Sequence, residues 1–300
     1  MSTEARGEAR ARVEVRRSWY FVEGANEAAL ESAASSGADV LIQELEDFTP
    51  PEARERARAL APQVLERWKK AGVVAAVRVN PLAGDGHADL HAVMRAAPDV
   101  VLLPKADDAE QIRALDAAIG ALERRYGLAV GSTEIVPNVE RARGLRDTYA
   151  ICTASPRVRA CLVASEDMAA DLGAERSRSG GELDYVRARF HVECVAAGVV
   201  SIDCPYTWTD DAGVEADTLA ARRLGYRAKS VVHAAHAAIV NRVLTPTAAE
   251  IAQARRVVEA FEAAQAAGRG RAEVDGSLIE VPIYLNARRL LERAARLGVD

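Results

Sequence analysis

Short apolar runs alternate with longer stretches rich in alanine, arginine and glutamate along most of the chain. The runs are continuous rather than alternately apolar and polar, which is typical of strands that are covered on both faces. A regular alternation of strand and helix predicts a parallel sheet. The eight predicted strands are residues 19–22, 40–42, 73–79, 100–105, 134–139, 158–164, 199–202 and 229–232.

Eight strand–helix units in about 230 residues match a (β/α)8 barrel, which typically needs about 250 residues. The alternative is an open, doubly wound parallel sheet, which would carry a glycine-rich phosphate turn after its first strand. Here that turn reads Gly24-Ala25-Asn26 and lacks the G-x-G-x-x-G pattern. We therefore predict an α/β fold, a (β/α)8 TIM barrel with a C-terminal helical extension.

The barrel pattern covers residues 17–246, and the segments on either side of it differ in character. Residues 1–16 are of mixed charge and lack the apolar core of a signal peptide, so we expect a flexible N-terminal arm. Residues 247–300 are too few for an independent domain, and we expect them to pack on the barrel or on a neighbouring subunit. The expected elements there are a helix over 247–267, a break at 268–270, a turn with extended flanks over 274–280 and a helix over 282–297.

Composition excludes several classes of function. The net charge of −5 is unlike that of a nucleic-acid-binding protein, and 5% aromatic residues are too few for a base-stacking platform. No apolar run approaches the 18 residues or so that a membrane span needs. We therefore expect a cytoplasmic protein. The four cysteines, Cys152, Cys161, Cys194 and Cys204, form no C-x-x-C pair, so we expect reduced, buried thiols.

Charged side chains gather where the predicted strands end. Because the carboxyl ends of barrel strands meet at one mouth, these side chains are expected to lie together. Helix capping would explain single acids among them, but it does not explain the bases or the size of the set. The set is Glu44, Glu46, Asp47, Arg78, Lys105, Glu140, Glu166, Asp167, Asp203 and His233.

Carboxylates that face a common mouth repel one another unless a cation joins them. An all-oxygen ligand set suits Mg²⁺, or Mn²⁺, better than Zn²⁺. Arg78 at the same rim could hold a substrate carboxylate through two hydrogen bonds, and His233 could orient a substrate. The residues alone thus predict a metal-dependent enzyme that acts on an oxo-acid or a hydroxy-acid.

Short motifs in a fixed order also carry a resemblance. From Arg17 to about Arg293, the chain resembles the citrate lyase beta-subunit-like family of the HpcH/HpaI aldolase superfamily. Each motif is weak alone, and their order and spacing make the resemblance specific. The matching segments are residues 17–22, 44–47, 78–81, 103–105, 139–145, 166–173, 202–203 and 275–276.

The resemblance implies a (β/α)8 barrel, usually a homotrimer or hexamer, that uses Mg²⁺. Such enzymes cleave or form a carbon–carbon bond in 3-hydroxyacyl-CoA substrates such as citryl-CoA, malyl-CoA or citramalyl-CoA. It assigns Glu140 and Asp167 as metal ligands and Arg78 as the group that binds the oxo-acid. Further residues that it implies are Glu46 and Asp47 for ordering water at the metal, Glu280 for catalysis in a neighbouring subunit's site, and Arg17, Lys105 and His233 for substrate binding.

The loop after the first strand departs from the family pattern. Family members usually read Val-Pro-Gly there, followed by one or two basic residues, whereas this chain reads Val22-Glu23-Gly24 and continues to Glu27 without a basic residue. The charges of Glu23 and Glu27 would repel the phosphates of CoA. The substrate could therefore be a free 3-hydroxy acid. Two other functions stay open at this point: a malyl-CoA thioesterase or malate-synthase-like activity, and a barrel that binds a metabolite without catalysis.

Overall fold

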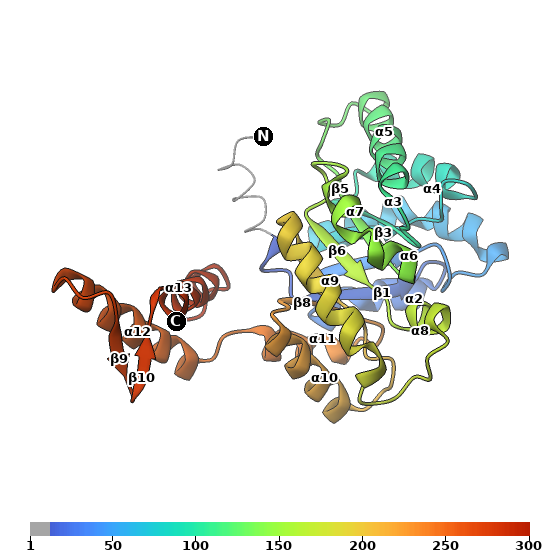
Figure 1. Cartoon of the computed structure of the whole chain (residues 1–300). Helices are drawn as coiled ribbons and strands as arrows, with labels where there is room; N and C mark the ends of the chain where they lie inside the picture. Colours follow the sequence, from blue (N-terminus) through green and yellow to red (C-terminus); the bar gives the residue numbers. More distant parts are fainter. Residues whose placement is uncertain (1–12) are drawn as a thin grey trace. The chain divides into compact units, whose positions relative to one another are not determined.

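The computed structural model describes residues 13–300, so most of the predicted N-terminal arm lies outside the described residues. Eight parallel strands close into a barrel in sequence order, which confirms the predicted fold (Figure 1). Each strand coincides with a predicted apolar run to within two residues at either end. The strands are β1 (Ser18–Glu23), β2 (Val40–Glu44), β3 (Val74–Arg78), β4 (Val100–Leu103), β5 (Glu134–Val139), β6 (Ala160–Val163), β7 (Val200–Asp203) and β8 (Ala228–Val231).

Side chains from alternate strand positions fill the barrel interior. This interior cluster is apolar and almost inaccessible to solvent, and it includes Trp19, Phe21, Val40, Ile42, Ala76, Val100, Leu102, Val136, Ala160, Leu162, Val200, Ile202 and Ala228. The intervening positions face the surrounding helices and are buried as well, as at Val77 and Val101. Burial on both faces explains why the runs are continuously apolar.

Helices cover the outside of the barrel. A helix follows every strand, as the eight predicted strand–helix units require, and two helices follow each of β5 and β6. The helix after β4, α5, begins with a capping box in which Asp108 and Gln111 bind each other's backbone N–H groups. The helices are α2 (Glu27–Ser32), α3 (Arg54–Lys70), α4 (Gly86–Val93), α5 (Ala109–Arg125), α6 (Ala142–Arg146), α7 (Thr148–Thr153), α8 (Glu166–Leu172), α9 (Asp184–Ala197), α10 (Asp211–Leu224) and α11 (His236–Leu244).

Gly24 lets the loop after β1 approach the end of β2 closely. A Cβ atom at this position would lie 2.1 Å from the carbonyl oxygen of Glu44, which no side chain tolerates. The Gly24 N–H instead donates to Thr49 Oγ1 at 3.0 Å. Glycine is therefore required here to fix the segment from which Glu44 and Glu46 project.

Residues 243–300 form a second compact unit. It consists of α12 (Ala248–Ala266), the hairpin strands β9 (Ala272–Val274) and β10 (Ser277–Ile279), and α13 (Val281–Arg296). Phe261 of α12 stacks on Tyr284 of α13 with ring centroids 4.7 Å apart. The hairpin turns at Asp275 and Gly276, both with positive φ, as an Asp-Gly turn requires. Within residues 13–300, no helix has the length and apolar character needed to cross a bilayer.

Candidate active site at the carboxyl ends of the barrel strands

Arg78, the last residue of β3, lies at the centre of a group of buried carboxylates. Its Nε donates to Glu44 Oε1 at 2.9 Å, whereas Nη2 lies 3.4 Å from Glu46 and Nη1 lies 3.6 Å from Glu140. Burial alone would lower the pKa of Arg78, but these three carboxylates more than offset burial and raise it. Only Nε is committed to a hydrogen bond in this group, so the two terminal nitrogens remain to bind an anion.

Two aromatic rings hold the guanidinium of Arg78 in place. Its central carbon lies 5.0 Å from the ring centroid of Phe21 and 5.7 Å from that of Phe48, within the range of cation–π attraction. The two rings meet edge to face with centroids 6.3 Å apart. The sequence analysis missed both, although Phe48 directly follows the acidic segment after β2 and Phe21 lies two residues from Trp19 on the interior face of β1.

Glu44 organises the loop that carries the other acids. Its carboxylate accepts the backbone N–H groups of Glu46 and Phe48, each at 2.6 Å, in addition to the Arg78 hydrogen bond. All of its hydrogen bonds are made within the protein, and its side chain is fully buried. Glu44 therefore acts as a structural anchor, which leaves Glu46 and Asp47 as the acids that project from this loop.

Lys105 pairs with both of these acids. Its Nζ donates to Glu46 and lies 3.1 Å from Asp47 Oδ2. Burial raises the pKa of Glu46 although Arg78 and Lys105 oppose it. Lys105 adopts a φ of +51°, a conformation that is rare for a residue with a side chain and that clusters at functional sites. The structure thus brings Lys105, Glu46, Asp47 and Arg78 together as predicted.

Glu140, directly after β5, is the most isolated acid of the group. Its side chain is fully buried, and neither carboxylate oxygen has a hydrogen-bond partner. Burial, together with the negative charges of Asp167 and Glu46, raises the pKa of Glu140 to about 8 despite the attraction of Arg78. Asp167 is the second residue of α8 and is half-buried. A buried, unpartnered carboxylate beside a second carboxylate fits a hard divalent cation, which would satisfy both.

Two predicted residues do not join this group, and they are corrections to the sequence analysis. Arg17 precedes β1, at the amino end of the barrel, where its side chain and backbone N–H bind Asp39 at 2.6–2.9 Å. Asp203 ends β7, but its side chain faces the outer helices instead of the mouth. Arg17 is therefore removed from the substrate-binding candidates, and Asp203 from the acids of the mouth.

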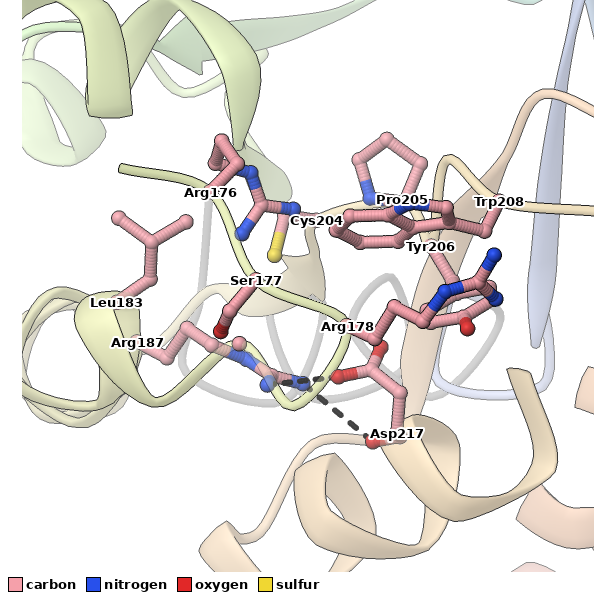
Figure 2. A pocket seen from close by; sticks show the side chains of 11 residues that line it. Arg176, Ser177, Arg178, Leu183, Arg187, Cys204, Pro205, Tyr206, Trp208 and Asp217 are labelled. Carbon is pink, nitrogen blue, oxygen red and sulfur yellow. Dashed lines mark hydrogen bonds and ion pairs between the residues drawn. The ribbon is translucent and has the colours of Figure 1, made fainter. Parts of the chain in front are cut away.

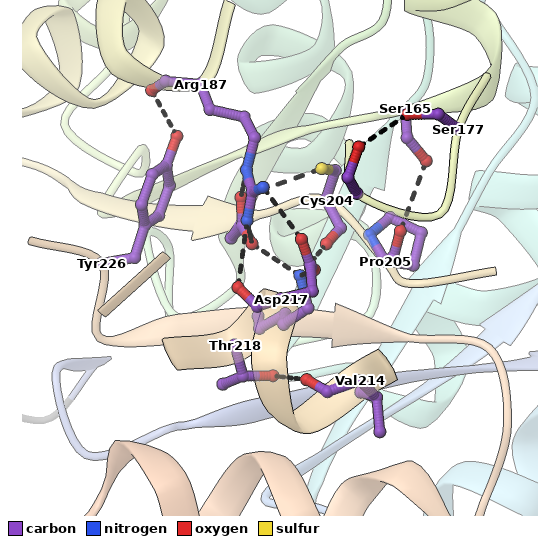
Figure 3. Close-up of polar contacts among 12 residues, drawn as sticks. Ser165, Ser177, Arg187, Cys204, Pro205, Val214, Asp217, Thr218 and Tyr226 are labelled. Carbon is purple, nitrogen blue, oxygen red and sulfur yellow. Dashed lines mark hydrogen bonds and ion pairs between the residues drawn. The ribbon is translucent and has the colours of Figure 1, made fainter. Parts of the chain in front are cut away.

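Asp203 belongs to a buried ion network between the barrel and its outer helices. Figure 3 shows Arg187 and Asp217 of this network, with Tyr226 beside Arg187. Its carboxylate binds Lys229 at 2.6 Å and Arg187 at 2.7 Å, and these two cations also pair with Asp217. Burial would raise the pKa of Asp203, but Lys229 and Arg187 hold it below its usual value. The hydroxyl of Tyr226 donates to the carbonyl of Arg187 at 2.7 Å. The network ties β7 and β8 to α9 and α10.

The loops after β6, β7 and β8 are joined by their own polar contacts. Glu166 accepts hydrogen bonds from Arg176 and from Thr207, each at 3.1 Å, so it is bound within these loops. His233 is the second residue after β8, and its Nε2 lies 3.1 Å from the Thr207 carbonyl oxygen. The guanidinium carbon of Arg176 lies 5.3 Å from the ring centroid of Trp208. Figure 2 shows Trp208 beside the loop that carries Arg176 and Arg178.

Glu280 lies in the C-terminal unit, where it precedes the first turn of α13 and is exposed to solvent.

The four cysteines are free and buried, as predicted. Three of them, Cys152, Cys161 and Cys194, have sulfur atoms that all lie within 4.8 Å of one another. Burial raises the pKa of Cys161 and of Cys194 well above the usual value, which favours protonated thiols at these two positions, whereas hydrogen bonds from both of them lower the pKa of Cys152.

Residues 17–234 match the family described as HpcH/HpaI aldolase/citrate lyase. The chain belongs to this family. As a member of the HpcH/HpaI aldolase/citrate lyase family, it is an enzyme of the lyase class. The barrel, the acids of its mouth and Arg78 thus have a family context that agrees with the resemblance seen in the sequence.

Individual relatives cover nearly the whole chain. The citrate lyase subunit beta of Haemophilus influenzae is 31% identical over 284 residues, which are 94% of this chain and 98% of that protein. A (3S)-malyl-CoA thioesterase of Cereibacter sphaeroides is also 31% identical, over 94% of this chain and 95% of that protein. Among solved structures, the protein CitE of Mycobacterium tuberculosis in complex with magnesium, acetoacetate and coenzyme A has a TM-score of 0.73 and 26% identity, and it covers 93% of this chain and 98% of its own.

Proposed function

We propose that the chain is a Mg²⁺-dependent carbon–carbon lyase that cleaves a 3-hydroxy acid, or its CoA thioester, into an oxo-acid and an acetyl-type fragment. The observation that carries this proposal is Glu140, a fully buried carboxylate with both oxygens unpartnered, beside Asp167 and Arg78. The citrate lyase relative and the magnesium in the related CitE structure support it.

Glu140 and Asp167 are the residues that would hold the ion, with Mn²⁺ as a possible substitute. When bound, a divalent ion supplies Lewis-acid stabilisation of the negative charge that develops on a substrate oxygen. Two carboxylates leave further coordination positions to water and substrate, which is the usual arrangement for Mg²⁺. The charge of the ion would also offset the cost of ionising Glu140 in its buried position.

Arg78 would bind the carboxylate of the oxo-acid half. Its two terminal nitrogens lie 3.4 and 3.6 Å from their nearest carboxylates, so both can turn to a substrate and form a bidentate pair. Phe21 and Phe48 restrict the guanidinium plane, and Glu44 fixes Nε. The substrate carboxylate would therefore be oriented before the reaction starts, which is a large part of catalysis by proximity.

We assign proton transfer to the acids after β2. Cleavage requires a base to take the proton of the 3-hydroxyl group, after which the electrons of the broken carbon–carbon bond move to the α-carbon of the acetyl fragment. The resulting enolate is then protonated. Burial raises the pKa of Glu46, which accepts a hydrogen bond from Lys105 and has Asp47 beside it, so we assign proton transfer to these two acids.

The remaining candidates have supporting roles in this proposal. Lys105 and His233 would contact the substrate from the rims after β4 and β8. Glu280 would act from the C-terminal unit, on a neighbouring subunit of a homotrimer or hexamer.

The test offers the purified protein citryl-CoA, malyl-CoA and citramalyl-CoA, and the matching free acids, with MgCl₂ or with EDTA. We expect an oxo-acid and an acyl product with MgCl₂ and no product with EDTA. Glu140→Ala and Asp167→Ala should each weaken Mg²⁺ binding measured by calorimetry. Undiminished binding in both variants would refute the assignment of the ligands, and an absence of oxo-acid from all substrates would refute the lyase.

A thioesterase is the second candidate, because one relative is a (3S)-malyl-CoA thioesterase of nearly the same length. In that reaction water attacks the thioester carbonyl, the carbon–sulfur bond breaks, and malate and free CoA are released. The products separate the two reactions, since hydrolysis releases a thiol and forms no oxo-acid.

The comparison of free acids with CoA thioesters also tests the acidic first loop. Glu23 is exposed at the end of β1, and Glu27 in the first turn of α2 pairs with Arg56 at 2.8 Å. If these charges disfavour CoA, exchanging Glu23 for lysine should lower the KM for a CoA thioester and leave the KM for the free acid unchanged.

A further inference from the structure

Asn138 is an unexplained polar side chain inside the barrel. It lies on β5 between Val136 and Glu140, two residues from each, so all three side chains share one face of the strand. Val136 belongs to the apolar interior, which places Asn138 on the inner face as well. Asn138 is fully buried, and neither Nδ2 nor Oδ1 has a hydrogen-bond partner.

The strand positions beside Asn138 are apolar. Leu162 is its register partner on β6, and Leu102 is the partner of Val136 on β4, and both belong to the apolar interior. Buried amides in folded proteins almost always have partners, and an orphaned one is costly compared with an apolar side chain of similar shape. Packing alone therefore does not explain an asparagine at this position.

Glu140 lacks the hydrogen-bond donors that its carboxylate needs. Both of its oxygens are buried acceptors without a donor, and Asn138 carries the nearest unused donor on the same face of the same strand. A carboxylate that binds a metal is commonly held by a hydrogen bond from a neighbouring side chain, which fixes its orientation. One contact would thus satisfy two groups that are unsatisfied at present.

We propose that Asn138 is a positioning residue for the metal ligand: its amide group donates to the Glu140 carboxylate when that carboxylate holds the cation. This inference rests on the proposed metal-dependent function. It assigns Asn138 a task that is distinct from substrate binding, because the side chain acts through Glu140 and touches no reacting atom.

The test measures Mn²⁺ binding to the purified full-length protein, by electron paramagnetic resonance of free Mn²⁺ and by calorimetry. Asn138→Leu removes the amide and keeps a similar branched shape, and Asn138→Ala serves if the leucine variant does not fold. We expect the Kd for Mn²⁺ to rise about 10- to 100-fold in either variant, the usual effect of removing such a supporting hydrogen bond. Leu162→Ala alters the same interior region without touching a polar group, and it should leave the Kd within about twofold of the wild-type value.

Thermal unfolding in EDTA shows that each variant is folded, and the Asn138→Leu protein should melt at or above the wild-type temperature because a buried unpartnered amide is gone. Wild-type affinity for Mn²⁺ in Asn138→Leu would overturn the inference, and so would an equal loss in Leu162→Ala. Failure of the wild-type protein to bind Mn²⁺ would overturn the proposed function as well. A third outcome refutes only the role of Asn138: the wild type binds Mn²⁺, Glu140→Ala abolishes this binding, and Asn138→Leu binds as tightly as the wild type.

Discussion

Replacing Glu140 by glutamine should stabilise the metal-free protein at alkaline pH, although it removes a candidate metal ligand. Burial raises the pKa of Glu140 to about 8 from an ordinary value of 4.5. Between these two pH values the folded protein keeps the proton that the unfolded chain has released. Stability therefore falls as pH rises through this range, by up to about 1.4 kcal/mol per pH unit, and the loss is complete above pH 8.

The pKa difference corresponds to a free-energy cost of about 5 kcal/mol for folding with an ionised Glu140. Arg78 already reduces this cost, while Asp167 and Glu46 add to it, so the value is a net effect of all the charges around the carboxyl group. Glutamine cannot ionise and avoids the cost. The unfolding free energy of Glu140→Gln should therefore exceed that of the wild type by little near pH 4.5 and by about 5 kcal/mol near pH 8.5.

Urea unfolding in EDTA at several pH values between 4.5 and 8.5 measures this difference. Glu52→Gln, at an exposed position on the first turn before α3, is the matched control and should show no such trend. Addition of MgCl₂ at pH 8 should stabilise the wild type and leave Glu140→Gln unchanged, because the ion binds the folded state through the ionised carboxylate. A difference between the two proteins that does not vary with pH would refute the reasoning.

Three further substitutions test other parts of the structure. Arg78→Lys should raise the KM for the 3-hydroxy acid or its thioester about 10- to 100-fold, because lysine has no planar group to form the bidentate pair or to contact the rings of Phe21 and Phe48. An unchanged KM in steady-state kinetics would argue against this role. Asp203→Asn should lower the unfolding free energy in urea titrations by about 3–5 kcal/mol, because Lys229 and Arg187 lose a buried counter-charge. The kcat of the folded variant should be unchanged. A stable variant without activity would place Asp203 in the active site. Gly24→Ala should cost about 1–3 kcal/mol and lower the thermal midpoint, since its Cβ would collide with the Glu44 carbonyl, and a wild-type midpoint would contradict the close approach.

The barrel could be predicted because its strands are apolar on both faces and its helices are long. Each strand contributes a continuous run, as in β4 (Val100–Leu103), and turn residues such as Gly37 separate the elements. The short helices α6 and α7 escaped prediction because five or six residues do not establish a helical period. Their positions depend instead on packing against α9, which no local pattern records.

The same property that made the strands easy to recognise concealed which side chains face the mouth. A strand that is apolar on both faces gives no sign of which alternate positions point inward. Glu44 and Asp203 both end a strand and are equivalent in the sequence, yet Glu44 contacts Arg78 at the mouth and Asp203 is bound among the outer helices. Arg17 was assigned to substrate binding because it belongs to the motif over residues 17–22. It precedes β1 and therefore lies at the amino end of the barrel, opposite the mouth.

Once the interior residues are known, position along each strand separates the two sets. Glu44 lies two residues after Ile42, and Arg78 lies two after Ala76, so both continue the inward-facing series. Asp203 lies one residue after Ile202 and faces outward. The same count places Asn138 and Glu140 two and four residues after Val136, the residue that β5 contributes to the apolar interior. An inward-facing polar residue near the carboxyl end of a strand borders the active site instead of the apolar core. The charge of Asp203 is explained by its ion pairs among the outer helices. The unpartnered amide of Asn138 has no such explanation, which is why we relate it to ligand binding.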